Sequence, residues 1–564
     1  MTDLDLTPAA RLPTAIDAIA EAWVDVQLDL FPEFQVHLGR AGQAGRVGEF
    51  TDYSPDGAEQ IIDATRSALA SIRSATPVDD VDWVTQLDLS RELQLAIDEH
   101  ADGFGERNLN VIVSPPQEMR EVFDLSPTET EADWGTIVQR LHNLPGAMDG
   151  YIQRLRCGIK TGNVPAIRQI REMIGQAGRQ ASPGGFFARF TERPLAGTTG
   201  LSAGLLHDLE VGSRECAGAY AALAAFLNDE LAEHAPQRDA VGRDRYALAS
   251  RHFLGTTVDL DETYEWGLDE LARTVVEQEH VARIIRPNAT ISEAVAVLDG
   301  DVGRKLYGTE ALREWMQSNS DRAVAELSKN HFDIPQEVKR LECLIAPTQE
   351  GGMYYTGPSD DFSRGGRMWW SVPEGITEFS TWRELTTVFH EGIPGHHLQI
   401  GLATHNKAML NTWRRNAGTS GHCEGWALYA ERLMEQLGFL DDPADRFGML
   451  DAQRMRAARV VLDIGVHLQK PRPDGTGVWD FDYALNFLRH NVTMSEPALR
   501  FEVNRYFGWP GQAPSYKVGQ RIWEQTRDDE KKRRGKDFNI KSFHTTALNL
   551  GGVGLDTLVA ALRR

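Results

Sequence analysis

The chain has 564 residues, and its 59 Lys and Arg against 82 Asp and Glu give a formal net charge of −23. Hydrophobic residues make up 41% of the sequence, which is close to the average of globular proteins. This acidic balance excludes general nucleic-acid binding, because it would repel a phosphate backbone. The basic run at 531–536 directly follows three acidic residues, so we interpret it as a solvated loop.

The start of the chain carries Asp3 and Asp5 where a secretory signal would carry positive charge. No stretch approaches the ~18 consecutive apolar residues that a membrane span requires. The cysteines stand far apart and form no CxxC pair, which suits a reducing compartment. We therefore expect a cytoplasmic protein without a membrane segment or a disulfide framework. The cysteines are Cys157, Cys216, Cys343 and Cys423.

Most of the chain shows apolar residues at helical spacing, as between Ile16 and Trp23 and between Leu205 and Phe226. The sequence therefore predicts a mainly α fold, with one large helical body over 1–564 that has sub-lobes. A helical N-terminal part is expected over about 1–340, and the part over 341–564 holds the motifs that carry chemistry. Breaks between helices are expected near Ser54–Gly57, Asn108–Glu118, Ser182–Gly185, His234–Asp244 and Pro471–Gly477.

One region after residue 340 changes character. Three short β-prone pieces, Cys343–Ile345, Met353–Thr356 and Met368–Val372, are separated by Gly, Pro, Ser and Asp, and they predict a small β-sheet. Helical signals return at Thr381, where T-W-R-E is typical of a capping box with Thr381 as N-cap and Glu384 at N3. A helix is therefore expected to begin just before a cluster of histidines.

Seven of the sixteen histidines lie between 390 and 490, and three of them stand in the motif HEGIPGHHLQ. Such clustering indicates a metal site. In the usual zinc-hydrolase motif, HExxH, the two imidazoles are four residues apart on one helical face and the Glu reaches the metal-bound water. Here the fourth position is Pro394, so that standard motif is absent.

The spacing of these histidines requires a broken helix. In a continuous helix His390 and His397 would share a face but lie ~10 Å apart along the axis, which is too far for two ligands of one ion. Pro394 and Gly395 supply the break, because Pro removes a backbone donor and Gly accepts unusual dihedral angles. A two-residue insertion then lets His396 take the second-ligand position, with His397 as the alternative.

A catalytic zinc that keeps one position for water needs a third protein ligand. The best candidate is Glu424, in a helical segment 28 residues after His396 that a helix hairpin would bring close. Glu431 lies seven residues later on the same face and is expected to accept a hydrogen bond from a ligand histidine. His422 and Cys423 are rival ligands, but neighbouring side chains on a helix project in other directions.

The motif HEGIPGHHLQ followed by EGWALYAE resembles the bacterial family catalogued as domain of unknown function 885. Its fold is similar to that of the thermostable carboxypeptidases and, more distantly, the thimet-type oligopeptidases. The resemblance covers about 340–550 by motif, and it implies a zinc peptidase with a helical body around a deep cleft. It places one Zn²⁺ per chain on His390, His396 and Glu424. Glu391 would then take a proton from the attacking water and deliver it to the leaving amine.

In such peptidases a Tyr or His donor from late in the chain stabilises the oxyanion beside the metal. The resemblance implies Tyr516 for this role, with Tyr506 and His544 behind it. Tyr506 also counts among the residues expected to bind substrate.

The segment that precedes the motif helix resembles the strand along which related peptidases lay the substrate backbone. Tyr355 is expected to contact substrate there, and Arg364 is expected to hold a substrate carboxylate as a bidentate fork. His397 is expected to contact either the substrate or a ligand side chain.

The sequence and the resemblance together predict a cytoplasmic zinc-dependent hydrolase that cleaves small peptides. Two alternatives stay open at this stage: a metal-assisted amide or ester hydrolase acting on a small metabolite, and a non-catalytic binding protein that retains the fold. The expected partner is a small peptide, with no nucleic acid and no membrane, and a homodimer is also considered.

Overall fold

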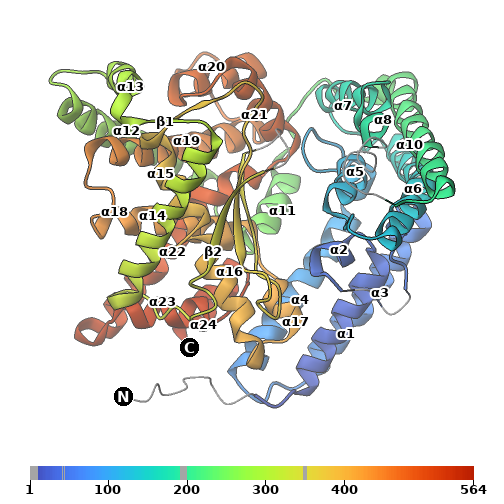
Figure 1. Ribbon diagram of the computed structural model, residues 1–564, viewed down its shortest axis with the longest axis horizontal. Helices are drawn as coiled ribbons and strands as arrows, with labels where there is room; N and C mark the ends of the chain where they lie inside the picture. The colour runs from blue at the N-terminus through green and yellow to red at the C-terminus, as the bar shows by residue number, and fades with distance from the viewer. Residues whose placement is uncertain (1–10, 41, 43–44, 191–199, 347–351) are drawn as a thin grey trace.

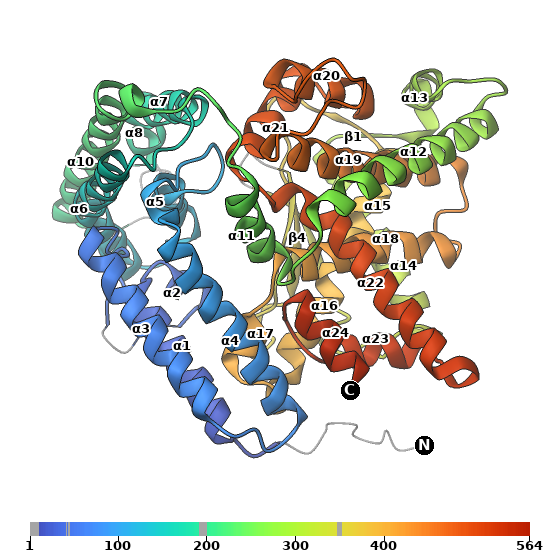
Figure 2. The same cartoon turned by 180° about the vertical axis from the view of Figure 1, so that it is seen from behind.

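Two groups of helices lie side by side in the computed structural model, which describes residues 11–40, 42, 45–190, 200–346 and 352–564 (Figures 1 and 2). The chain is mainly α-helical, as predicted. The N-terminal lobe consists of α1 (Ala15–Leu30), α2 (Phe34–Leu38), α3 (Pro55–Ser74), α4 (Asp80–Ala101), η1 (Phe104–Glu106), α5 (Pro115–Leu125), α6 (Glu131–Thr161), α7 (Ile167–Ala181), α8 (Phe186–Phe190), α10 (Ala203–Asp229) and η2 (Leu231–His234).

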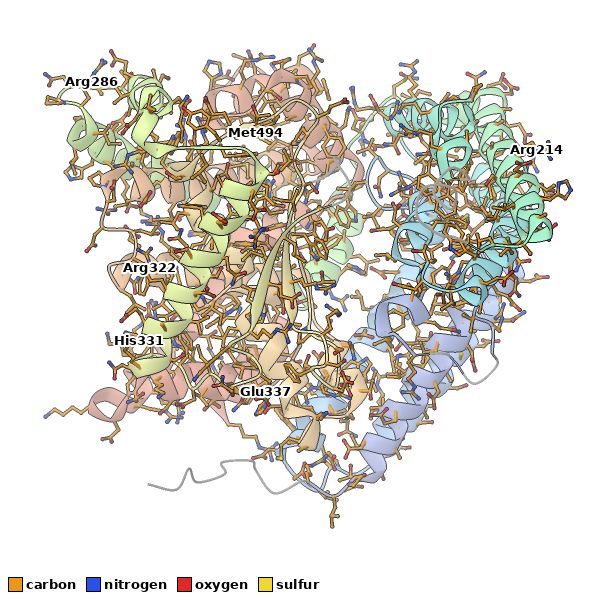
Figure 3. The ribbon with its side chains drawn as sticks, viewed as in Figure 1. Arg214, Arg286, Arg322, His331, Glu337 and Met494 are labelled. Carbon is orange, nitrogen blue, oxygen red and sulfur yellow. The ribbon has the colours of Figure 1, made fainter. Side chains whose placement is uncertain are left out.

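The C-terminal lobe contains the remaining helices and the strands. Its helices are α11 (Arg243–Leu254), α12 (Leu260–Ile285), α13 (Ile291–Gly300), η3 (Val302–Arg304), α14 (Thr309–Asn330), α15 (Thr381–Glu391), α16 (His396–His405), η4 (Asn406–Ala408), α17 (Thr412–Asn416), α18 (Ser420–Gln436), α19 (Pro443–His467), α20 (Phe481–Asn491), α21 (Glu496–Gly508), α22 (Gln512–Arg534), η5 (Gly535–Asp537), α23 (Ile540–Leu548) and α24 (Leu555–Arg563). Figure 3 shows Arg322 on α14 and His331 at the C-terminal end of that helix.

Each lobe has its own hydrophobic core. One core takes its buried residues from between Phe50 and Leu231, and the larger core takes nearly all of its residues from Tyr246 onwards. The two cores therefore divide within the predicted break at His234–Asp244. The larger core already includes α11 to α14, so residue 340 lies inside this second core.

A third cluster joins the two lobes. It packs α1, α3 and α4 against Trp413 of α17. Ile16, Ala20 and Trp23 are buried in this cluster, so the helical periodicity read from the first residues marks a true buried face. No described helix is long and apolar enough to span a membrane.

The strands form two small sheets next to the motif helix. In the first, β1 (Lys305–Tyr307) pairs antiparallel with β5 (Glu378–Ser380). The second has the order β2 (Leu341–Ile345), β4 (Gly366–Trp370), β3 (Met353–Thr356), with β4 parallel to β2 and antiparallel to β3. The three predicted β pieces are confirmed, although β4 begins and ends two residues earlier than expected.

The three-stranded sheet supports α15 from one side. Buried side chains of its strands pack with α14 and α15, and they form a cluster that includes Met316, Met368 and Val388. Residues at every second position of β4 are buried, as is typical of a strand with one covered face. The sheet therefore fixes the position of the helix that carries His390.

The predicted capping box at the start of α15 is wrong. The helix does begin at Thr381, but its N-cap is Ser380, the last residue of β5, and no side-chain cap bond forms. Strand and helix follow each other directly, and the Thr381 hydroxyl instead donates a hydrogen bond to the Arg304 carbonyl at 3.1 Å. Burial raises the pKa of Glu384, the expected N3 partner, to about 7.

A cavity of about 570 Å³ lies between the lobes. The N-terminal lobe contributes the end of α4 and the η1 segment, and the C-terminal lobe contributes α11 and the end of α21 near Trp509. None of the predicted site residues lines it. This cavity is therefore separate from the histidine cluster.

Candidate metal centre

The helix break expected at Pro394 and Gly395 is present. α15 ends at Glu391, and α16 begins at His396. The loop between them folds back on α15, since the Gly395 amide donates to the Phe389 carbonyl at 3.1 Å. A Cβ added at Gly395 would lie 1.9 Å from the His390 carbonyl oxygen, so glycine is required there.

A tryptophan from another helix holds this loop in place. The indole Nε1 of Trp426, on α18, donates a hydrogen bond to the Pro394 carbonyl at 2.8 Å. Trp426 is fully buried, so the loop is anchored from inside the core. The break therefore depends on α18, the helix that also carries Glu424.

His390, His396 and Glu424 come together into one group. The Glu424 Oε2 lies 3.2 Å from His390 Nε2 and 3.6 Å from His396 Nε2, and the two imidazole rings are 4.9 Å apart between centroids. All three ligand atoms lie within 4.8 Å of one another. Ligands ~2.0–2.1 Å from a tetrahedral zinc are separated by ~3.3 Å, so this donor set fits such an ion.

The surroundings of His390 leave one nitrogen for a metal. Its Nδ1 donates to the Glu431 carboxylate at 2.8 Å, which directs Nε2 toward Glu424. Thr386 donates a hydrogen bond to the second Glu431 oxygen at 2.9 Å. Burial lowers the pKa of His390, but hydrogen bonds to Glu424 and Glu431 outweigh it and raise the pKa to about 10. A metal ion at Nε2 must therefore displace a proton.

Glu391 lies directly beside the ligand group. It is the last residue of α15 and is 7% exposed, and its charge acts on His390. Its carboxylate makes no hydrogen bond to any residue that the structure describes. A buried carboxylate without a structural partner, next to residues that could hold a metal ion, has the properties of a general base.

A close helix crossing brings Tyr516 toward Glu424. α18 and α22 meet at glycines, and a Cβ added at Gly425 would lie 2.4 Å from the carbonyl carbon of Gly519. Burial raises the pKa of Tyr516, and the charge of Glu424 raises it further. The Arg459 guanidinium lies 5.3 Å from the centre of the Tyr516 ring. Tyr516 is therefore a neutral phenol within range of the Glu424 charge.

Residues 32–562 match the model of a family described as bacterial protein of unknown function, DUF885. The chain belongs to the DUF885 family. No curated protein matches this DUF885 chain.

Two solved bacterial structures, the first two named here, share the fold of this DUF885 protein. A candidate lipoprotein from Colwellia psychrerythraea is 21% identical, with 97% of this chain and 98% of that one covered and a TM-score of 0.85. A candidate lipoprotein of unknown function from Shewanella oneidensis is 14% identical, with 98% and 100% covered and a TM-score of 0.74. A carboxypeptidase from Pyrococcus furiosus is 11% identical, with 98% and 99% covered and a TM-score of 0.42.

Two of the predicted oxyanion donors lie apart from the ligand group of the DUF885 protein. Tyr506 is buried, where it hydrogen-bonds Glu502 and accepts from Arg459 Nε at 2.6 Å. His544 hydrogen-bonds the Tyr429 hydroxyl at 2.8 Å, and burial lowers its pKa to about 3. Both side chains have structural partners, whereas Tyr516 makes no hydrogen bond to a described residue.

The predicted substrate residues Tyr355 and His397 contact each other. The Tyr355 hydroxyl and His397 Nδ1 are 2.8 Å apart, and His397 Nε2 donates to the Val338 carbonyl at 2.7 Å. Burial lowers the pKa of His397 to about 4. Both ring nitrogens are engaged, which leaves neither for a metal and favours His396 as the second ligand.

Arg364 lies in the loop between β3 and β4. Its backbone amide donates to the Ser359 hydroxyl at 2.9 Å, and its Nη1 donates to the Gly365 carbonyl at 3.3 Å. Neither contact involves the ligand group. Nearby Arg367 forms an ion pair with Glu342 at 2.9 Å, so it belongs to the sheet.

His422 and Cys423, the rival ligands next to Glu424, lie outside the group formed by His390, His396 and Glu424. His422 packs over Trp523 with ring centroids 5.4 Å apart, and burial lowers its pKa to about 4. Burial and the charge of Glu424 raise the pKa of the Cys423 thiol to about 12. Neither side chain belongs to the group whose ligand atoms lie within 4.8 Å of one another.

Sequence reasoning missed a row of polar residues on α19. Gln453 Nε2 lies 3.4 Å from Glu431 Oε2, and Arg459 lies over Tyr516. Between them stands Arg456. Positions three residues apart share a face of a helix, so Gln453, Arg456 and Arg459 form one polar face of α19.

Proposed function

We propose that this DUF885 protein is a zinc-dependent hydrolase of peptide bonds in small peptides. The observation that carries the proposal is the ligand group, in which two imidazole nitrogens lie 3.2 and 3.6 Å from one Glu424 oxygen. Among the described residues, no other group of three His, Cys, Asp or Glu gathers in this way. An orienting carboxylate on His390, an adjacent unpaired Glu391 and a nearby neutral phenol add the other parts of a hydrolytic site.

Each side chain has a role in the proposed reaction. A zinc ion held here would supply Lewis-acid activation of water and of the substrate carbonyl. Glu391 accepts a proton from the water and later delivers it to the leaving amine. Tyr516 donates a hydrogen bond to the carbonyl oxygen as negative charge develops on it. Glu431 keeps the His390 ring in position through its hydrogen bond to Nδ1.

The position of β3 supports a peptide as the substrate. β3 is at the edge of the three-stranded sheet and packs against α15, the helix of His390 and Glu391. An extended peptide is recognised by adding to such an edge through main-chain hydrogen bonds. A small peptide is therefore the proposed partner, and a cytoplasmic location is proposed with it.

The first test is the metal content of the purified protein by elemental analysis. We expect close to one zinc per chain, its loss in His390→Ala, and its retention in His405→Ala, a matched change at the far end of α16. Glu391→Gln should keep zinc and lose turnover of a panel of short peptides. Absence of zinc from a protein purified without chelator, or full activity of Glu391→Gln, would overturn the proposal.

A further inference from the structure

Arg456 lies on the face of α19 that also carries Gln453 and Arg459. It stands one turn after Gln453, which contacts Glu431, and one turn before Arg459, which lies over the Tyr516 ring. Arg456 therefore lies between Glu431, which hydrogen-bonds His390, and Tyr516, the predicted oxyanion donor. The charge of Arg456 acts on both Glu431 and Tyr516, which is consistent with this placement.

The Arg456 guanidinium forms no salt bridge to a described residue; its charge acts on Glu431, but the oxygens of that carboxylate are bonded to His390, Thr386 and Gln453. The Arg456 Nε is buried without a hydrogen bond, and its Nη1 reaches only the Ala452 carbonyl of the preceding turn, at 3.4 Å. Nearby Arg459 and Arg505 on the same side of Tyr516 are instead paired with Glu502. A partly buried guanidinium with an unpaired Nε is costly, and an external carboxylate would satisfy it.

The neighbouring charges do not neutralise Arg456. Arg459 and Arg505 share a single carboxylate, Glu502, at 2.9 and 3.3 Å. Two guanidinium groups and one carboxylate leave this trio with one positive charge. Asp463, on which the charge of Arg505 acts, is fully buried, and burial raises its pKa to about 7. Three guanidinium groups, those of Arg456, Arg459 and Arg505, therefore act on Tyr516 together with the carboxylate of Glu424.

We propose that Arg456 is a specificity-determining residue that binds the terminal carboxylate of the peptide substrate. A guanidinium presents parallel N–H donors that match the two oxygens of a carboxylate. The inference rests on the proposed function. It assigns to α19 the role that sequence reasoning gave to Arg364, and it places the scissile bond close to the carboxyl end of the peptide.

The test compares two ligands that differ only at the C-terminus, acetyl-trialanine with a free carboxylate and acetyl-trialanine amide. Binding is measured by calorimetry on zinc-loaded Glu391→Gln protein, which cannot turn over the ligand. We expect the free acid to bind about 30-fold more tightly than the amide, as for a desolvated charge pair. Adding Arg456→Gln should remove this preference and leave amide binding unchanged.

Two further variants separate anchoring from a general structural effect. Arg456→Lys keeps the charge but loses the planar fork, so it should retain part of the preference. Arg454→Gln removes an arginine from another face of α19, where it hydrogen-bonds His490 and Asn491, and should keep the full preference. Zinc content and thermal midpoint are measured for each variant to confirm that it is folded.

The outcomes distinguish this inference from the proposed function. Equal affinity for acid and amide, no binding of either, or an equal loss of both in Arg456→Gln would overturn the role of Arg456. Wild-type protein that hydrolyses both forms equally would keep the hydrolase and discard the carboxylate anchor. An Arg456-dependent preference for the acid without any hydrolysis would support the anchor and overturn the peptidase.

Discussion

Glu431 accepts a hydrogen bond from His390 Nδ1 at 2.8 Å, and it does so from a position that is 1% exposed. A carboxylate buried this deeply is stabilised by its partners. Burial raises its pKa, but the hydrogen bond and charge of His390 outweigh this, so the pKa of Glu431 stays below its usual value. The pair therefore fixes which imidazole nitrogen faces Glu424.

Glu431→Gln tests this orienting role. The amide keeps the size of the side chain but loses the charge that stabilises the His390 N–H, so we expect zinc affinity to fall about 10–100-fold. Competition with a chromophoric chelator measures the change. Glu435→Gln, one turn later, breaks only a pair with Arg432 and Arg446, and it should leave zinc affinity unaltered. Equal affinities in the two variants would contradict the role of Glu431.

Tyr516→Phe tests the proposed oxyanion donor. Removing one such donor typically lowers kcat about 10²–10³-fold, and KM should change little. Tyr506→Phe is the matched control, because this hydroxyl hydrogen-bonds Glu502 and Arg459 inside the core. It should reduce stability by about 1–3 kcal/mol while kcat changes far less. A larger kcat loss in Tyr506→Phe than in Tyr516→Phe would reverse the assignment.

The ligand group was predictable because its information is local. His390 and His396 are six residues apart in the sequence. Pro394 and Gly395 between them predict the helix break that brings the two imidazoles together. Glu424 required only one further helix. The small sheet was equally readable, since its β-prone pieces are bounded by turn residues.

The outer parts of the site were not predictable in the same way. Tyr506 and Tyr516 stand in one short run, and nothing in their sequence says which of them faces the metal group. The turn near Gly511 separates α21 from α22, so Tyr506 is directed into the core while Tyr516 follows the helix that crosses α18. Such a choice depends on tertiary packing, as did the role of the Thr381 hydroxyl.

Gly395→Ala tests whether the helix break is needed for the site. The added Cβ would lie 1.9 Å from the His390 carbonyl oxygen, so the backbone must move by a distance that also displaces His396. We expect at least a tenfold loss of zinc affinity and a lower thermal midpoint, with a cost of about 1–3 kcal/mol. Gly146→Ala, inside α6 with open space around its Cβ, should be neutral or stabilising by up to ~1 kcal/mol.

Asp463 predicts how stability depends on pH. Burial raises its pKa to about 7, although hydrogen bonds from Tyr246 at 2.7 Å and from the Gly511 amide at 3.0 Å favour the charged form. Since the unfolded pKa is ~3.9, the folded state binds the proton more tightly between pH 4 and 7. Stability should therefore fall as pH rises through this range and level off above it.

Asp463→Asn removes this dependence, because an amide oxygen still accepts both hydrogen bonds and cannot ionise. Thermal unfolding is measured at pH 5 and pH 8. Between these pH values the free energy of unfolding of the variant should rise by about 1–3 kcal/mol relative to that of the wild type. Asp261→Asn is the control. Hydrogen bonds from Arg243 and Lys470 lower the pKa of Asp261 to about 2, so it is ionised across the range and its effect should not change. The same Asp463→Asn difference at both pH values would mean that this carboxyl group is already charged in the folded protein at pH 5.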